Sequence, residues 1–266
     1  MKVFICADME GITTTTTWKE VDQSYWSYGL HAKQMTEEVL ACIQGVKQAG
    51  ATEIVVKDAH ESATNIDPTR MPAGVILLRN WSGHPYQMVE GIDRTFDAAL
   101  FVGHHSAAGR TGNPTSHTMT ARCNYLKLNG MIASEFLLYS YACALEGVPT
   151  VFLSGDRMLC EDSKDLHPKL VTCAVKDGSG AITMNYSTED TIARIRELSE
   201  QALTQNLNHA LAELPDYFEA EFCFKEHTWA EAASYFPGVI RKNENTVLFQ
   251  SDNFFEVLRT IKWIMV

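Results

Sequence analysis

Carboxylates and imidazoles follow three apolar, strand-like segments of the sequence. The pairs are Asp8 and Glu10, Asp58 and His60, and His104 and His105. Residues at positions i and i+2 of an extended chain point the same way, so we expect each of the first two pairs to aim at one point. Carboxylate oxygens mixed with imidazole nitrogens, without thiolates, suit zinc, manganese or cobalt better than calcium or an iron–sulfur cluster. Because converging acids repel each other, a divalent metal between them is expected.

Each of these motifs taken alone is also typical of a solvated loop or a helix cap. Their coincidence at successive strand ends favours the metal site, because ligands of a parallel sheet gather at the carboxyl ends of its strands. Other catalytic motifs are missing from the sequence, which has no GxSxG elbow, no GxxxxGK[ST] phosphate loop and no GxGxxG after the first strand.

The elements that must position these residues alternate between strand-like and helix-like patterns. Short apolar segments predict strands at Val3–Ala7, Glu53–Val56, Gly74–Leu78, Ala98–Val102, Thr150–Leu153 and Leu170–Val175. Helical periodicity predicts a helix through Met35 and Val46 that ends near Gly50, a helix over Ser134–Leu145, and a helix capped by Ser187 that spans 188–211. The alternation predicts a three-layer α/β/α fold with a mainly parallel sheet.

The pattern changes after Pro215. A strand at Phe218–Phe224, a helix near Trp229, a hairpin around 243–245 and a final amphipathic helix are expected there. We therefore divide the chain into an α/β catalytic region, 1–214, and a C-terminal α+β extension, 215–266. Asn129-Gly130 predicts a hairpin turn, whereas Thr13–Thr17 and Gly178–Gly180 are interpreted as loops.

Composition and charge narrow the possible partners. The 266 residues are 45% hydrophobic, and 33 acidic against 22 basic residues give a net charge of -11. This charge argues against nucleic acid and against an anionic membrane as partners. Because the sequence has no apolar run long enough to span a membrane and no signal-peptide pattern at its start, a cytoplasmic location is expected. Seven scattered cysteines without a CxxC pair are interpreted as buried thiols.

Six short motifs occur in an order that matches one family of metallopeptidases. They are ADMEGI at the N-terminus, KDAH at 57–60, MVEGID at 88–93, FVGHHS at 101–106, TSHTM at 115–119 and ASE at 133–135. With these motifs the sequence resembles the DppA-like D-aminopeptidases, the zinc-dependent M55 family. The resemblance covers at least residues 1–160 and extends more loosely over the rest.

The resemblance implies a centre of two divalent metal ions, most readily Zn²⁺. Its expected ligands are Asp8 bridging both ions, Glu10 and His60 on one ion, and His105 and Glu135 on the other. Two divalent cations against three carboxylates and a bridging hydroxide would leave the centre neutral, which suits a buried site.

The resemblance also implies one catalytic residue, His117 of the TSHTM motif, which would stabilise an oxyanion or carry a proton to the leaving amine. His105 is preferred to His104 as the ligand because the family motif has a tyrosine at the position of His104. Lys57 stands where the family more often has asparagine, and Ser134 where it has glycine. These departures lie beside proposed ligands without removing one.

The function that the resemblance implies is that of a dinuclear zinc aminopeptidase. It would remove the N-terminal residue of short peptides, with a preference for D-amino acids, through a hydroxide that bridges the metals. The family also implies a homo-oligomer, in the form of a ring-shaped decamer. Two alternatives stay open at this point: another dinuclear amidase or phosphoesterase, and a non-catalytic metal-binding member of the family.

Overall fold

A seven-stranded, mostly parallel sheet forms the centre of the molecule. The computed structural model describes residues 1–265, with only the backbone at 208, so residue 266 of the predicted extension lies outside the described residues. In spatial order the strands are β3 (Val75–Leu78), β2 (Glu53–Asp58), β1 (Lys2–Ala7), β4 (Ala98–His104), β7 (Thr150–Asp156), β8 (Val171–Ser179) and β9 (Ile182–Asn185). All neighbours pair in parallel except β8 and β9, which form an antiparallel hairpin.

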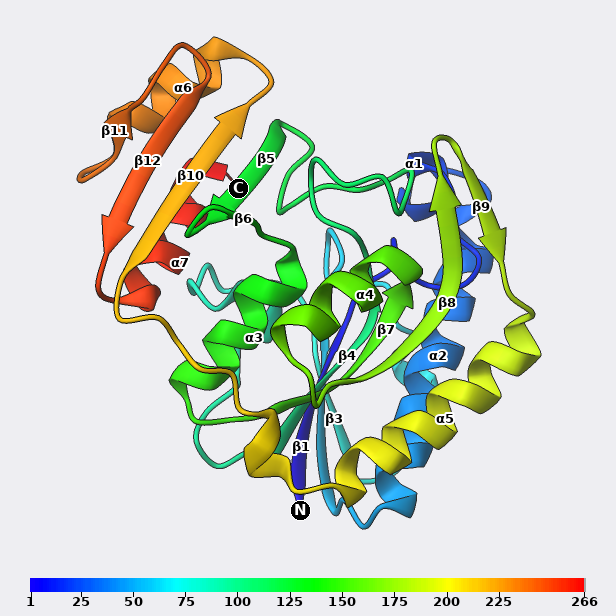
Figure 1. Cartoon of the computed structure of the whole chain (residues 1–266). Helices are drawn as coiled ribbons and strands as arrows, with labels where there is room; N and C mark the ends of the chain where they lie inside the picture. The colour runs from blue at the N-terminus through cyan, green and yellow to red at the C-terminus, as the bar shows by residue number, and fades with distance from the viewer. Residues whose placement is uncertain (266) are drawn as a thin grey trace.

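Helices cover both faces of this sheet, as Figure 1 shows. One face carries α2 (Tyr28–Gln48) and α5 (Thr188–Thr204), which pack against each other, and the short helix α1 (Trp18–Val21) lies beside α2. The other face carries α3 (Glu135–Leu145) and α4 (Arg157–Leu166). The predicted three-layer α/β/α arrangement with a mainly parallel sheet is therefore confirmed.

The alternation of side chains along β1 explains why the sheet is buried on both sides. Val3 and Ile5 belong to the core shared with α2 and α5, whereas Phe4 and Cys6 belong to the core on the other face, and all four are fully buried. A strand covered on both faces needs a continuous apolar sequence. This is the pattern that the sequence shows before Asp8.

A second, antiparallel sheet packs onto the face that carries α3. Its strands, in order, are β11 (Ile240–Arg241), β12 (Thr246–Ser251), β10 (Phe218–Phe224), β5 (Cys123–Leu128) and β6 (Met131–Ile132), and it carries α6 (His227–Ser234) and α7 (Phe254–Met265). Phe222 and Val247 share one hydrophobic cluster with Phe4 and Phe101 of the main sheet. Because β5 and β6 precede residue 214, the second sheet takes strands from both sides of the predicted division.

Most of the predicted elements are present, but the structure differs from the predictions in several places. The helix predicted over 188–211 ends at Thr204, because Gln205 is extended, and a short 3-10 helix follows at Leu207–Ala210. The interpretation of Gly178–Gly180 as a loop is wrong, since β8 continues to Ser179 and turns at Gly180 into β9. Helix α4 was not expected; its N-cap is Asp156, whose side chain accepts a hydrogen bond from the amide of Leu159.

The remaining described segments are turns and two further 3-10 helices, Pro68–Arg70 and Gln87–Val89. Asn129 and Gly130 both have positive φ, 50° and 81°, and form the hairpin turn predicted between β5 and β6. Within residues 1–265 no helix has the length and apolar character that crossing a membrane requires.

Candidate metal centre

The carboxyl ends of β1 and β4 are in contact, and this contact brings the ADMEGI motif next to the FVGHHS motif. The amide of Asp8 donates to the carbonyl of Val102 at 2.9 Å, and the amide of Gly11 donates to the carbonyl of Gly103 at 2.8 Å. A Cβ on Gly11 would lie 1.7 Å from the carbonyl oxygen of His104, so only glycine fits there. The glycine of the DMEG sequence therefore allows the two strand ends to converge.

The five predicted metal ligands meet in one buried cluster, and each is at most 5% exposed. His60 Nδ1 lies 2.9 Å from Glu10 Oε2 and 3.5 Å from Asp8 Oδ1. On the other side of Asp8, His105 Nε2 lies 3.5 Å from Asp8 Oδ2 and 3.5 Å from Glu135 Oε2. Asp8 thus stands between the two histidines, as a bridging ligand would.

Backbone carbonyls fix which ring nitrogen of each histidine faces the cluster. His60 Nε2 pairs with the carbonyl of Val21 at 2.9 Å, and His105 Nδ1 pairs with the carbonyl of Ser106 at 2.9 Å. A carbonyl only accepts, so these nitrogens carry ring protons, and the opposite nitrogens, which face the carboxylates, are the ones available to bind a metal. Histidines that bind metals are oriented in this way by their second ring nitrogen.

Two atoms in the middle of the cluster lack a hydrogen-bond partner among the described residues. They are Asp8 Oδ2 and His105 Nε2, both buried, and they face each other across 3.5 Å. Buried polar atoms without a partner are costly, and a metal cation placed between these two would satisfy both. Three groupings of these side chains bring their ligand atoms within 4.8 Å of one another: Asp8, Glu10 and His105; His105, His117 and Glu135; and Asp8, His104 and Glu135.

The electrostatics of the cluster without metal also indicate a site built for added positive charge. Burial and the neighbouring Glu10 carboxylate raise the pKa of Asp8 to about 7. Although burial opposes the change, the carboxylates around His105, above all Glu135, raise the pKa of this histidine to about 10. The acids thus draw protons onto their neighbours when no metal neutralises them.

Glu135 is held by the start of α3 and by an unusual loop residue. Ser134 caps the helix by accepting a hydrogen bond from the amide of Leu137 at 3.1 Å, which leaves Glu135 in the first turn, where a negative charge is favourable. The amide of Met119 donates to Glu135 Oε1 at 2.7 Å, and Met119 has a φ of 61°, a rare conformation outside glycine. A helix terminus and a strained loop together orient this carboxylate.

His117 lies at the edge of the cluster, on the wall of the cavity. Its Nδ1 pairs with the carbonyl of Thr115 at 2.9 Å, and its Nε2 lies 3.6 Å from Glu135 Oε1. The ring stacks on His105, with centroids 4.3 Å apart, and also contacts Trp18. Burial and the adjacent His105 lower the pKa of His117, which favours the neutral ring.

Two polar residues near the strand ends behave differently from the five ligands. Contrary to the expectation that it aims where His60 does, Asp58 turns away and accepts hydrogen bonds from the amides of Asn65 and Ile66 at 2.6 and 2.8 Å. The strand ends at Asp58 and the chain bends at His60, so the i, i+2 rule of an extended chain fails here. His104 is fully buried against Phe101, and neither ring nitrogen has a partner among the described residues.

The segment after β1 is clamped by buried polar residues that the sequence did not point to. Lys176 of β8 donates to the backbone carbonyls of Glu10 and Thr15, the latter at 2.7 Å, and is completely buried. From the opposite side Glu38 of α2 accepts from the amide and hydroxyl of Thr13 at 2.9 and 2.8 Å. A lysine and a glutamate far away in sequence thus hold Glu10 in place, and no local pattern marks them.

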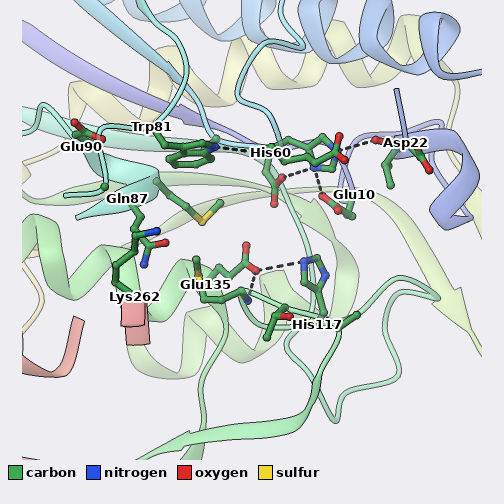
Figure 2. A pocket seen from close by; sticks show the side chains of 18 of the residues that line it. Glu10, Asp22, His60, Trp81, Gln87, Glu90, His117, Glu135 and Lys262 are labelled. Carbon is green, nitrogen blue, oxygen red and sulfur yellow. Dashed lines mark hydrogen bonds and ion pairs between the residues drawn. The ribbon is translucent and has the colours of Figure 1, made fainter. Parts of the chain in front are cut away.

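The cluster opens into a cavity of about 530 Å³. Figure 2 shows Glu10, His60, Glu135 and His117 around one part of it, with Trp81, Gln87 and Lys262 toward the other part. Trp81 lines this cavity together with Trp18 and Met88. Such a volume is in the range that small-molecule sites occupy.

An α/β sheet whose strand ends hold buried carboxylates and imidazoles, beside a cavity of ligand size, defines the class of metal-dependent hydrolases. The chain belongs to the peptidase M55 D-aminopeptidase family, whose model matches residues 1–263.

Comparisons with a curated sequence and with a solved structure agree with this assignment. A D-aminopeptidase of Bacillus subtilis strain 168 is 28% identical over 263 residues, which are 98% of this chain and 95% of that protein. The solved structure of the Zn-dependent D-aminopeptidase DppA from Bacillus subtilis, described as a self-compartmentalizing protease, superposes with a TM-score of 0.91 and 28% identity. The superposition covers 99% of this chain and 96% of the other. The family resemblance expected from the six motifs is therefore confirmed.

Proposed function

We propose that this protein is a zinc aminopeptidase that removes the N-terminal residue of short peptides, with a preference for D-amino acids. The observation that carries the proposal is the pair of buried atoms without hydrogen-bond partners, Asp8 Oδ2 and His105 Nε2, at the centre of a carboxylate and histidine cluster. Membership of the M55 family and the activity of the Bacillus subtilis relatives support the same reaction.

In this proposal five residues hold two metal ions, with Asp8 shared, Glu10 and His60 on one ion, and His105 and Glu135 on the other. Divalent metals bound there would acidify a water molecule and polarise the scissile carbonyl. His105 is assigned before His104 because its Nε2 is oriented by the Ser106 carbonyl and lies 3.5 Å from two carboxylates. His104 has no such orienting partner.

His117 is assigned the transfer of a proton to the leaving amine. Because Nδ1 pairs with the carbonyl of Thr115, the Nε2 atom that faces the cavity has a free lone pair. A nitrogen in this state takes up a proton and releases it to the amine, whereas donating a hydrogen bond to an oxyanion would need a proton already on it. The geometry thus favours the proton-transfer role over the oxyanion role.

A phosphoesterase with the same metals is the second candidate reaction. Phosphoryl transfer normally uses arginine or lysine side chains that hold the phosphate oxygens. Among the described residues that line the cavity there is no arginine, and Lys262 lies away from the cluster in Figure 2. These features favour peptide hydrolysis.

The test is a parallel assay of the zinc-loaded protein on D- and L-aminoacyl nitroanilides and on nitrophenyl phosphate. We expect hydrolysis of the aminoacyl substrates, with the D forms faster, and little release from the phosphate. His117→Ala should lower kcat by about 100-fold or more while the bound zinc stays the same. Phosphate hydrolysis without peptidase activity would contradict the proposal, and loss of zinc in His117→Ala would show that His117 is instead a ligand.

We also infer a homo-oligomer, in the form of a decamer, and a cytoplasmic location. The oligomer is supported by the self-compartmentalizing description of the Bacillus subtilis structure. The location is supported by seven cysteines that are all free in the structure, six of them buried, which is the pattern of a reducing compartment.

A further inference from the structure

The cavity has two hydrogen-bond donors that the metal centre and His117 do not use. One is Gln87, which is only 5% exposed and whose Nε2 has no hydrogen-bond partner among the described residues. The backbone of Gln87 has a φ of 37°, which is rare for a residue with a side chain. A strained residue that buries an unpaired amide beside a cavity is a feature that ligand sites retain at a cost in stability.

The second donor is Lys262 of α7. Its side chain lines the same cavity and is half-buried, and the described residues place no carboxylate within ion-pair distance and no hydrogen-bond acceptor on its Nζ. Glu90, an acid on the same wall, accepts instead from the amide of Ser82 at 3.3 Å. Lys262 is the only lysine or arginine among the described residues that line the cavity.

Figure 2 places Gln87 and Lys262 at one end of the cavity, and Glu10, His60 and His117 toward the other. A substrate that has its scissile bond at the metal centre therefore extends toward the amide and the ammonium. Both groups offer N–H donors, and a lysine adds positive charge, which is the combination that binds a carboxylate.

We propose that Gln87 and Lys262 bind the C-terminal carboxylate of the peptide, so that the enzyme selects short peptides with a free carboxyl terminus. This inference rests on the proposed function, because it assigns the far end of the same substrate. In a cavity of about 530 Å³ a short peptide can place its scissile bond at the metal centre and its terminal carboxylate at the two donors. The terminal carboxylate of a long peptide would lie beyond them. The preference would thus be set by chain length as well as by charge.

The test compares a D-alanyl dipeptide with the same dipeptide capped as a C-terminal amide. The variants are Lys262→Met and Gln87→Leu, with Arg259→Met as the matched control, since Arg259 is an exposed cation on the same helix and does not line the cavity. The wild type should prefer the free acid by roughly 10- to 100-fold in kcat/KM, the range expected when a charged hydrogen bond is lost. Lys262→Met should abolish most of this preference through KM, whereas Arg259→Met should keep it.

A third substrate separates the terminal carboxylate from a side-chain carboxylate. It is the dipeptide amide with D-aspartate as its second residue, which carries an acid only on its side chain. We expect it to behave like the neutral amide; turnover as fast as that of the free acid would overturn the assignment to the chain terminus.

A binding measurement keeps the proposal testable apart from catalysis. A dipeptide isostere with a methylene in place of the scissile carbonyl, in acid and amide forms, is titrated into the zinc-loaded protein by calorimetry. Tighter binding of the acid form in the wild type, lost in Lys262→Met, supports the subsite. Equal binding of both forms, or an acid preference unchanged in Lys262→Met and Gln87→Leu, overturns it. If no peptide is hydrolysed at all, the proposed function fails instead, and the calorimetry still decides whether the two residues bind a carboxylate.

Discussion

At the scale of single residues, the site depends on which nitrogen each imidazole presents. The sequence predicted the five ligands and His117 from strand ends and from the family motifs, and these six side chains do lie together. It misjudged Asp58, because a bend at His60, just after the strand ends, breaks the extended geometry on which the prediction relied. It had no means of finding Gln87 or Lys262, since neither belongs to a chemical motif and the two meet only through the fold.

The metal-free protein should lose stability as the pH rises from 7 to 9, and His105 should be a main cause. The pKa of His105 is about 10 in the folded protein and about 6.5 in an unfolded chain, so its contribution is fully present below pH 6.5 and is lost as the pH rises toward 10. As the pH rises, we expect the free energy of unfolding to fall more steeply for the metal-free wild type than for His105→Asn. The difference between the two slopes should be about 1 kcal/mol per pH unit.

Urea denaturation at several pH values measures the free energy of unfolding of both metal-free proteins. Groups that titrate alike in the two proteins, such as Lys176, contribute equally to both pH slopes, so the difference between the slopes reports on His105. Zinc loading should remove the extra slope, since a ligand histidine is neutral. Parallel pH profiles of the two metal-free proteins would show that His105 does not carry the proton that its surroundings favour.

At the scale of elements, the contact between the ends of β1 and β4 decides whether the ligands converge. Gly11→Ala would place a Cβ 1.7 Å from the carbonyl oxygen of His104, a backbone atom that cannot move without shifting His105. We expect a loss of roughly 3 kcal/mol or more in the free energy of unfolding, together with weakened zinc binding.

Gly29→Ala is the matched control for this substitution. It lies within α2, and a Cβ there meets nothing within 4 Å, so the variant should be neutral or more stable by roughly 0.5–1 kcal/mol. Thermal unfolding and zinc titration of both variants check the pair. Gly11→Ala with the stability and zinc affinity of the wild type would mean that the close approach of the two strand ends is not required.

The presence and approximate bounds of most strands and helices of the main sheet followed from apolar periodicity and caps, because those signals are local. The membership of β5 and β6 in the second sheet did not, because it depends on pairing with β10, almost a hundred residues away in sequence. The clamp by Lys176 and Glu38 was missed for the same reason, since each residue acts through backbone atoms of a distant loop.

At the scale of the whole molecule, the outer edge of the main sheet offers a surface for the proposed homo-oligomer. Ile182 and Met184 of β9 are 66% and 62% exposed, whereas Thr183 between them contacts Thr16 on the inner side. Apolar side chains that are exposed on the sheet edge of a single chain are typical of a surface that another chain covers.

The double variant Ile182→Lys, Met184→Lys should shift the mass seen by light scattering toward the 29.7 kDa of one chain. An unchanged oligomer would place the interface elsewhere, and a monomeric wild type would contradict the homo-oligomer.

The measurement that tests the central claim most directly is the metal content of the purified protein, determined by mass spectrometry for the wild type, Asp8→Ala and Asp22→Ala. Asp22 is the control, because it is a carboxylate on the cavity wall outside the buried cluster. The account predicts about two zinc ions per chain in the wild type and in Asp22→Ala, and the loss of most of them in Asp8→Ala. A wild type that holds no transition metal after reconstitution, or an Asp8→Ala variant that keeps both ions, would contradict the dinuclear centre.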